Sequence, residues 1–145
     1  MICIYIMVHE LLPMLKIGSD LDGVIAYNPL NKADYRPFWL NEYYSACQPT
    51  ELSKMPIDVI ITGRKIFFKK LTQRWLELYG VKYKELIMFP NKTKKTNQSL
   101  AQYKARVINE LGITNYYEDD KRIADFLKQN CPGAKIIFVE KLIKK

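Results

Sequence analysis

The sequence is poor in the residues that carry several common kinds of site. Only three cysteines occur in its 145 residues, and no two of them form a CxxC pair. The single histidine, His9, lies near the N-terminus without a partner motif. We therefore expect neither structural zinc nor a Ser-His or Cys-His catalytic system. The scattered cysteines favour a reducing, cytoplasmic compartment over a disulfide-rich secreted class.

Long hydrophobic runs are also missing. The apolar tract at residues 1–8 is too short to span a bilayer. It lacks the basic start and the small-residue cleavage site of a secretory signal, so we expect neither a signal peptide nor a membrane partner. We interpret residues 1–13 as an extra edge strand or as a lead-in to the domain.

Acidic residues are fewer than basic ones. The chain has 15 Asp and Glu against 23 Lys and Arg, a formal net charge of +8. Hydrophobic residues make up 48% and charged residues 26%, which is typical of a globular chain, and the length predicts a single domain over residues 1–145. The basic excess is either an ordinary solubilising surface or an attraction for phosphate-bearing partners, including nucleic acid.

Short apolar runs alternate with helical patterns along the chain. The apolar runs are residues 15–21, 57–62, 85–89, 114–118 and 135–139. The helical patterns are residues 64–79, 99–111 and 121–130. Continuous apolar strands of this length are typical of parallel sheets covered on both faces. The sequence therefore predicts an α/β fold: a doubly wound, Rossmann-type three-layer sandwich with a central parallel sheet of about five strands.

Residues 26–56 interrupt this alternation. They contain several prolines and an aromatic helical tract. We interpret them as a short helical insertion after the first strand, or a minimal cap over its exit. The aromatic residues of the tract are Phe38, Trp39, Tyr43 and Tyr44. Such rings can stack on a base, but their helical spacing is more typical of packing against the domain.

Two carboxylates follow the first predicted strand, in the segment Asp20-Leu21-Asp22-Gly23. Strand alternation sends Asp20 and Asp22 to the same side. Two such carboxylates repel each other unless a cation lies nearby, and hard oxygen ligands suit Mg²⁺. Gly23 permits a sharp turn. The alternative is an ordinary turn that ends the strand.

Polar residues also follow two later strands. Thr62-Gly63-Arg64 comes where strand 57–62 is expected to end, and it suits an oxyanion, although a Thr helix cap has the same pattern. The acids at 118–120 fit either a cation site or the acidic start of a helix.

A lysine on the predicted helix 99–111, Lys104, precedes the last acidic segment, and Lys94 and Lys95 are alternatives for its role. In a doubly wound sheet, strand exits of this kind converge on one ligand site.

Together these motifs resemble those of the haloacid dehalogenase-like (HAD) phosphohydrolase superfamily. DLDGVIA at 20–26 resembles its first motif and IITGR at 60–64 its second. Lys104 is similar to the lysine of its third motif, and YYEDD at 116–120 resembles its fourth. The resemblance spans residues 15 to about 139 and implies a HAD-like fold.

The resemblance implies a magnesium-dependent phosphatase. Asp20 would be the nucleophile that forms an aspartyl-phosphate. Asp22 would protonate the leaving group and then activate water, while its backbone carbonyl would bind Mg²⁺.

The resemblance also implies how phosphate and metal would be bound. Thr62, with Gly63 and Arg64, would bind the phosphate, and Lys104 would neutralise it. Asp119 would hold Mg²⁺ together with Asp20, and Glu118 or Asp120 would support it.

The substrate is less well defined by the sequence. The short insertion suggests an open site, suited to a phosphorylated small molecule or to the end of a larger one. The basic charge fits a nucleotide or a polynucleotide end, and we expect a nucleotidase-like phosphatase. A non-catalytic nucleic-acid-binding module on the same fold, or a phosphotransferase, are the alternatives.

Overall fold

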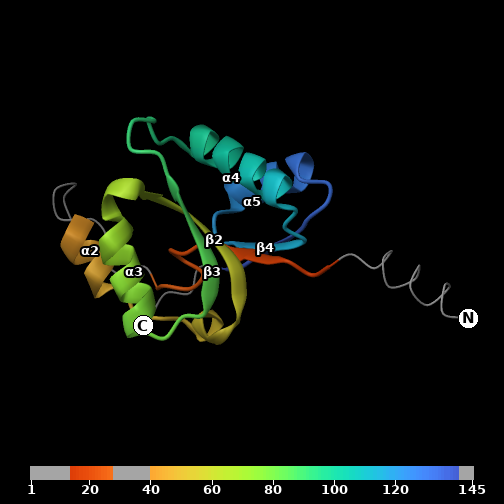
Figure 1. Cartoon of the computed structure of the whole chain (residues 1–145). Coiled ribbons are helices and arrows are strands. Elements are labelled where there is room, and N and C mark those ends of the chain that lie inside the picture. The colour runs from red at the N-terminus through yellow and green to blue at the C-terminus, as the bar shows by residue number, and fades with distance from the viewer. Residues whose placement is uncertain (1–13, 28–39, 141–145) are drawn as a thin grey trace, which may run out of the picture.

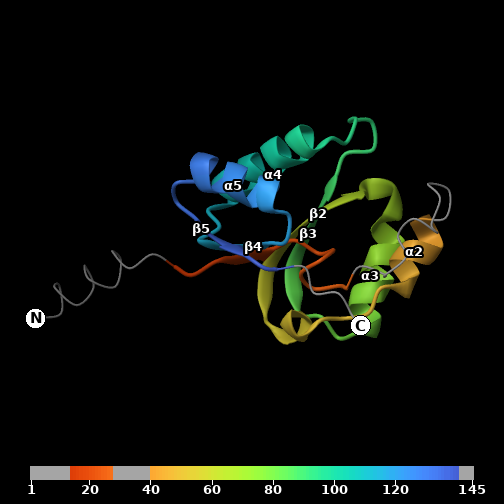
Figure 2. The same cartoon turned by 180° about the vertical axis from the view of Figure 1, so that it is seen from behind.

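A parallel β-sheet forms the centre of the molecule (Figures 1 and 2). The computed structural model describes residues 14–27 and 40–140. Its strands are β1 (Ile17–Ser19), β2 (Ile57–Lys65), β3 (Tyr83–Phe89), β4 (Asn115–Glu118) and β5 (Lys135–Phe138). They lie in the order β3-β2-β1-β4-β5, and each neighbouring pair is parallel. This confirms the predicted doubly wound α/β fold. The strand expected within residues 1–13 lies outside the described residues.

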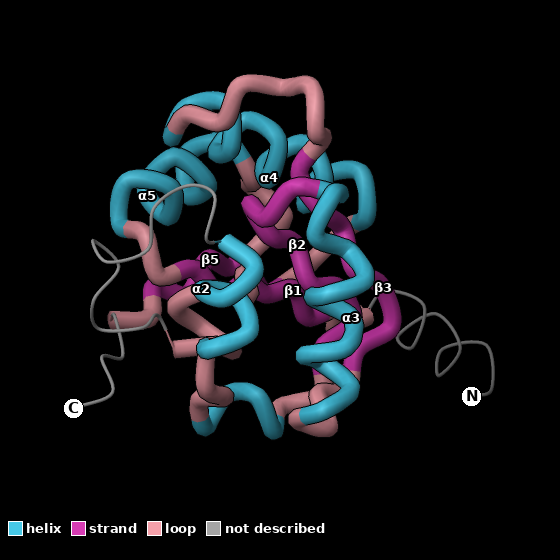
Figure 3. The backbone as a smooth tube through the Cα atoms, turned by 90° about the vertical axis from the view of Figure 1, so that its left-hand side faces the viewer, coloured by secondary structure: helices cyan, strands magenta, loops and turns pink. Residues whose placement is uncertain are grey.

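Helices cover both faces of this sheet (Figures 1 and 3). They are α2 (Leu40–Ala46), α3 (Lys69–Leu78), α4 (Asn97–Leu111) and α5 (Lys121–Asn130). Side chains of β2 alternate between the two layers: Val59 and Ile61 pack with α4 and α5, whereas Ile60 packs with α2 and α3. Because both faces are buried, β2 has a continuous apolar run rather than an alternating one.

Local capping signals set the ends of the helices that flank the site. Thr96 and Ser99 form a capping box at the start of α4, and Gly112 ends that helix at φ 64°. Asp120 caps α5 by accepting hydrogen bonds from two backbone N–H groups. Within residues 14–27 and 40–140, no helix is both long and apolar enough to cross a bilayer.

The predicted end of the second strand was wrong. The strand was expected to end at Thr62 and a helix to begin at Arg64, but β2 continues to Lys65 and α3 begins at Lys69. A short 3₁₀ helix, Ile66–Phe68, joins them. The register between β2 and β3 shifts after Thr62, and a Cβ on Gly63 would lie 2.9 Å from Leu100 Cδ2 of α4. Gly63 therefore marks a bulge where a helix approaches the strand closely, not a helix start.

The insertion after β1 packs against the domain where the structure describes it. Tyr43 and Tyr44 of α2 are buried, which confirms the packing interpretation of their spacing. Phe38 and Trp39 lie outside the described residues. The interpretation of residues 26–56 as a cap remains a prediction.

Candidate active site

The acids predicted from the strand ends meet where the chain order reverses. β1 and β4 are neighbours in the sheet, and Asp20 N donates to Tyr117 O of β4 at 2.9 Å. Asp20 follows β1, while Glu118 ends β4 and Asp119 follows it. In doubly wound sheets, ligands bind beyond the carboxyl ends of the strands at this position.

Carboxylate oxygens of Asp20, Glu118 and Asp119 all lie within 4.8 Å of one another, and the three residues are buried. Burial and then the charge of Glu118 raise the pKa of Asp20 well above its ordinary value, although Lys104 opposes this. The same two causes raise the pKa of Asp119 to about 6. The cluster therefore favours binding either protons or a cation, and its all-oxygen donor set fits a hard divalent ion such as Mg²⁺.

Lys104 is the lysine that reaches this cluster. Its Nζ lies 2.7 Å from Glu118 Oε2 and 3.2 Å from Asp20 Oδ2, and the residue is 1% exposed. Burial lowers the pKa of the Lys104 ammonium, but the charges of Asp20, Tyr116 and Glu118 outweigh this and raise it well above its ordinary value. Of the two alternatives, Lys95 lines the same cleft and its Nζ donates to Gly63 O at 3.2 Å, and Lys94 is exposed.

The three adjacent acids of β4 and α5 have different surroundings. Glu118 Oε1 accepts from the backbone N–H groups of Asp119 and Asp120, each at 3.2 Å, while Oε2 accepts from Lys104. Asp120 Oδ1 accepts from Arg122 N and so serves as the α5 cap. Both oxygens of Glu118 and both oxygens of Asp20 already have partners, so each of these acids would bind a cation through its remaining lone pairs.

Asp22 pairs with Arg64 instead of joining the acidic cluster. Arg64 Nη2 donates to Asp22 Oδ1 at 2.7 Å, and Nε donates to Oδ2 at 2.9 Å. The buried guanidinium also donates to Thr72 Oγ1 at 3.3 Å and lies 4.0 Å above the Tyr44 ring. Asp22 and Arg64 thus hold each other in place. The expected contact of Arg64 with a phosphate remains a prediction, and so does the Asp22 carbonyl as a metal ligand.

Thr62 lies behind the site. Its side chain is fully buried, and Oγ1 accepts from Arg64 N at 3.1 Å. Gly63 and Arg64 line the cleft beside it, but Thr62 is not among the described lining residues. Its expected hydrogen bond to a phosphoryl oxygen remains a prediction.

Gly23 has a role that its turn signal did not reveal. Its φ is +87°, and a Cβ at this position would overlap the Asp119 carboxylate. The glycine therefore allows the DxDG turn to pass directly against the acids that follow β4. The sequence offered only the glycine itself as a signal.

The acids, Arg64 and Lys104 line one open cleft of about 370 Å³. The acids and Lys104 form one wall, and Leu40, Tyr43 and Tyr44 from the insertion contribute to another. A buried ammonium and a nucleophilic carboxylate at one end of such a cleft can bind a small anion and attack it.

Comparisons with known proteins support the fold. No family model and no curated protein matches the chain. A chain in a solved structure of the Pnkp1/Rnl/Hen1 RNA repair complex matches with a TM-score of 0.68 at 15% identity, over 86% of this chain and 42% of that one. A second structure of the Pnkp1/Rnl/Hen1 complex matches with a TM-score of 0.66 at 17% identity, over 90% and 47%. The similarity is one of fold. This chain spans less than half the length of either matched chain.

Proposed function

We propose that the chain is a magnesium-dependent HAD-like phosphatase that removes phosphate from the end of a polynucleotide through an aspartyl-phosphate on Asp20. The observation that carries this proposal is the position of Lys104 Nζ, 3.2 Å from Asp20 and 2.7 Å from Glu118, beside acids able to hold a cation. Phosphoryl transfer depends mainly on positioning and on neutralising charge, and this arrangement supplies both.

Asp20 is suited to act as the nucleophile. Its Oδ1 accepts from Leu21 N at 2.8 Å, and its Oδ2 faces Lys104. A carboxylate oxygen forms a bond to phosphorus while the bond from phosphorus to the leaving oxygen breaks. Water then attacks the same phosphorus, and breaking the bond between Asp20 and phosphorus restores the carboxylate. The first step requires the ionised carboxylate, which Lys104 favours but burial and the charge of Glu118 oppose, so a bound cation would complete the ionisation.

Asp22 would move the protons of this reaction. It would donate one to the leaving oxygen and then accept one from the attacking water. Each of its carboxylate oxygens accepts one hydrogen bond from Arg64, which leaves a second lone pair on each oxygen for the transferred proton.

Asp20 and Asp119, supported by Glu118, would hold Mg²⁺. When bound, the ion would neutralise charge on the phosphoryl oxygens. The chain's own acids and Lys104 do the positioning.

A polynucleotide end is the substrate class that three observations support together. The cleft is open, the chain has a net charge of +8, and the fold is similar to that of chains from an RNA repair complex. One observation favours a non-catalytic nucleic-acid-binding module instead. Arg64 donates to both carboxylate oxygens of Asp22, the residue that would act as the general acid.

Hydrolysis assays test the proposal. An aryl phosphate and oligonucleotides phosphorylated at the 3′ or 5′ end are incubated with the full chain, with and without Mg²⁺. Asp20→Asn should lower the rate by at least about 10³-fold. The exposed acid Asp125 provides a matched control, and Asp125→Asn should retain activity. Unchanged turnover in Asp20→Asn would contradict the nucleophile assignment, and oligonucleotide binding without hydrolysis would favour the binding module.

A further inference from the structure

Two chain segments follow the carboxyl ends of the paired strands β2 and β3 (Figures 1 and 2). Asn91 joins them: Lys65 Nζ donates to Asn91 O at 3.0 Å, and Phe67 N donates to Asn91 Oδ1 at 2.8 Å. Lys95 Nζ donates to Gly63 O, and both residues line the cleft. We call residues 65–67 and 91–95 the basic rim.

The sequence through the basic rim is strongly biased in charge. No Asp or Glu occurs between Asp58 and Glu77 or between Glu85 and Glu110. The first interval contains Arg64, Lys65, Lys69, Lys70 and Arg74, and the second contains Lys92, Lys94, Lys95, Lys104 and Arg106. The lysines of the second loop are exposed. Such a surface attracts a polyanion, whereas the cleft beside it is lined by carboxylates.

A row of aromatic rings leads from the cleft to this rim. Tyr44 lines the cleft, and its ring centroid lies 5.1 Å from that of Phe68. Phe68 in turn lies 5.2 Å from Phe67, which is 77% exposed, and the adjacent Ile66 is 46% exposed. An exposed aromatic ring among lysines is the usual platform on which an unpaired base stacks.

We propose that the basic rim binds the single-stranded nucleotides next to the terminal phosphate of a polynucleotide. Phe67 stacks on an unpaired base, and Lys92 and Lys94 contact backbone phosphates. The proposal rests on the proposed function for the phosphate in the cleft, and it narrows the substrate to a single-stranded end. A free nucleotide has no further backbone phosphate for the lysines, and a fully paired end has no unpaired base for Phe67, so neither can offer both contacts.

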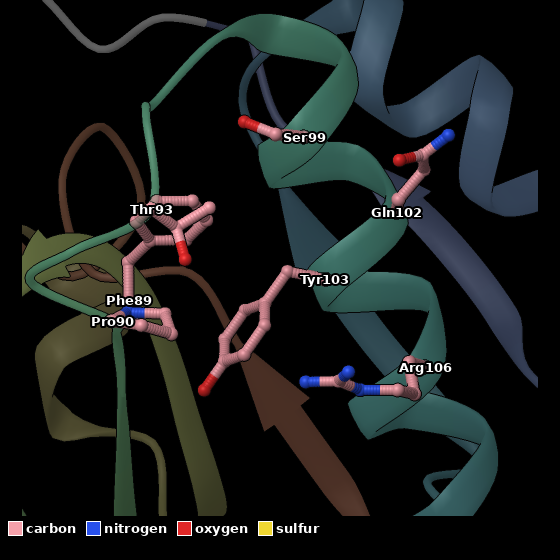
Figure 4. A pocket seen from close by; sticks show the side chains of 7 residues that line it. All are labelled: Phe89, Pro90, Thr93, Ser99, Gln102, Tyr103 and Arg106. Carbon is pink, nitrogen blue, oxygen red and sulfur yellow. The ribbon is translucent and has the colours of Figure 1, made fainter.

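A neighbouring hollow of about 340 Å³ is a weaker candidate for the same role (Figure 4). It lies between the β3–α4 loop and α4, and it contains the side chains of Tyr103 and Arg106. The Tyr103 hydroxyl donates to Met88 O at 2.9 Å, its ring contacts Phe89, and the Arg106 guanidinium lies 5.3 Å from its centroid. Because these rings are already covered by protein groups, the hollow offers no free platform for a base.

Binding measurements without chemistry test the proposal. The full wild-type chain is titrated with a fluorescent single-stranded oligonucleotide that carries no terminal phosphate, and anisotropy is followed at several salt concentrations. Phe67→Ala should weaken binding by about 5- to 100-fold. The double variant Lys92→Ala/Lys94→Ala should reduce the slope of log K against log salt by about 1.4.

A double variant elsewhere controls for the loss of charge alone. Lys82 and Lys128 are exposed and lie outside the basic rim, so Lys82→Ala/Lys128→Ala removes the same charge. This control variant should bind the oligonucleotide with an affinity within about twofold of wild type. Thermal unfolding verifies that every variant is folded. Equal weakening by both double variants, or wild-type affinity in Phe67→Ala, would overturn the proposal, and so would a preference for a blunt duplex.

This outcome is separable from that of the proposed function. Because the probe has no phosphate to remove, its binding does not depend on hydrolysis. Binding that needs Phe67 in a chain that hydrolyses no phosphate ester would support the rim and contradict the phosphatase. If the chain hydrolyses aryl phosphate but Phe67→Ala binds the probe as tightly as wild type, the phosphatase proposal is supported and the basic-rim proposal is contradicted.

Discussion

The carboxyl ends of β1 and β4 and those of β2 and β3 lie side by side but differ in charge and exposure. The first pair carries Asp20, Glu118 and Asp119, all less than 10% exposed. The second pair leads to exposed lysines and to Phe67. Burial shifts the pKa values of side chains, and such shifts are common among catalytic groups. Exposed charges attract a polyanion and change the free energy of unfolding little. The two pairs of strand ends thus suit different tasks, reaction at one and attachment at the other.

The largest effect on stability is expected from the buried cation. Lys104→Met removes the ammonium from Asp20 and Glu118, which leaves buried acids without their partner. The free energy of unfolding should fall by about 3–5 kcal/mol, as measured by denaturant titration without Mg²⁺. The exposed Lys121, 3.6 Å from Asp125, is the control, and Lys121→Met should change stability by less than about 0.5 kcal/mol. Similar losses in both variants would show that the burial of Lys104 does not set its contribution to stability.

A smaller effect is expected at the turn that touches the acids. Gly23 and Gly112 both have positive φ, but only a Cβ at Gly23 would meet a neighbouring group, the Asp119 carboxylate. Gly112→Ala should cost about 1 kcal/mol from backbone strain alone, and Gly23→Ala should cost clearly more. In thermal unfolding, Gly23→Ala should also lose the rise in Tm caused by Mg²⁺, which Gly112→Ala should keep. The cation assignment would be wrong if both variants kept that rise.

A further effect is expected from pH. The pKa of Asp119 rises from 3.8 to about 6 in the folded chain, so the folded state holds this proton more tightly than the unfolded state. Its contribution to stability is therefore complete below about pH 4 and is lost as the pH rises through about 6. Mg²⁺ competes with the proton, so the increase in Tm that it causes should grow over the same range. Thermal unfolding from pH 4.5 to 7.5 would check this, and an increase largest at the acidic end would refute it.

The meeting of Asp20 with Glu118 and Asp119 could be predicted because it follows from topology. Parallel strands that share a sheet end at the same edge, so residues that follow two such strands lie together. Strand ends recognised from apolar runs were therefore enough to place these acids, whereas Lys104 lies on a helix and was chosen over Lys94 and Lys95 by the resemblance of its motif.

The pairing of Asp22 with Arg64 could not be predicted in the same way. The two residues are 42 positions apart, and the resemblance implied a separate role toward the substrate for each of them. Their contact depends on β2 running three residues beyond its expected end, and Gly63 hid that extension because glycine also marks turns. The junction of the two loops at Asn91 is hidden for a similar reason, because an asparagine in a loop usually signals only a turn.

The Arg64–Asp22 pair has a kinetic consequence for the proposed reaction. If molecules with the pair closed cannot transfer a proton through Asp22, the observed rate is the intrinsic rate multiplied by the fraction of molecules in which it is open. A substrate anion that competed for the guanidinium would raise that fraction on binding. The chain would then become competent only in the presence of its own substrate.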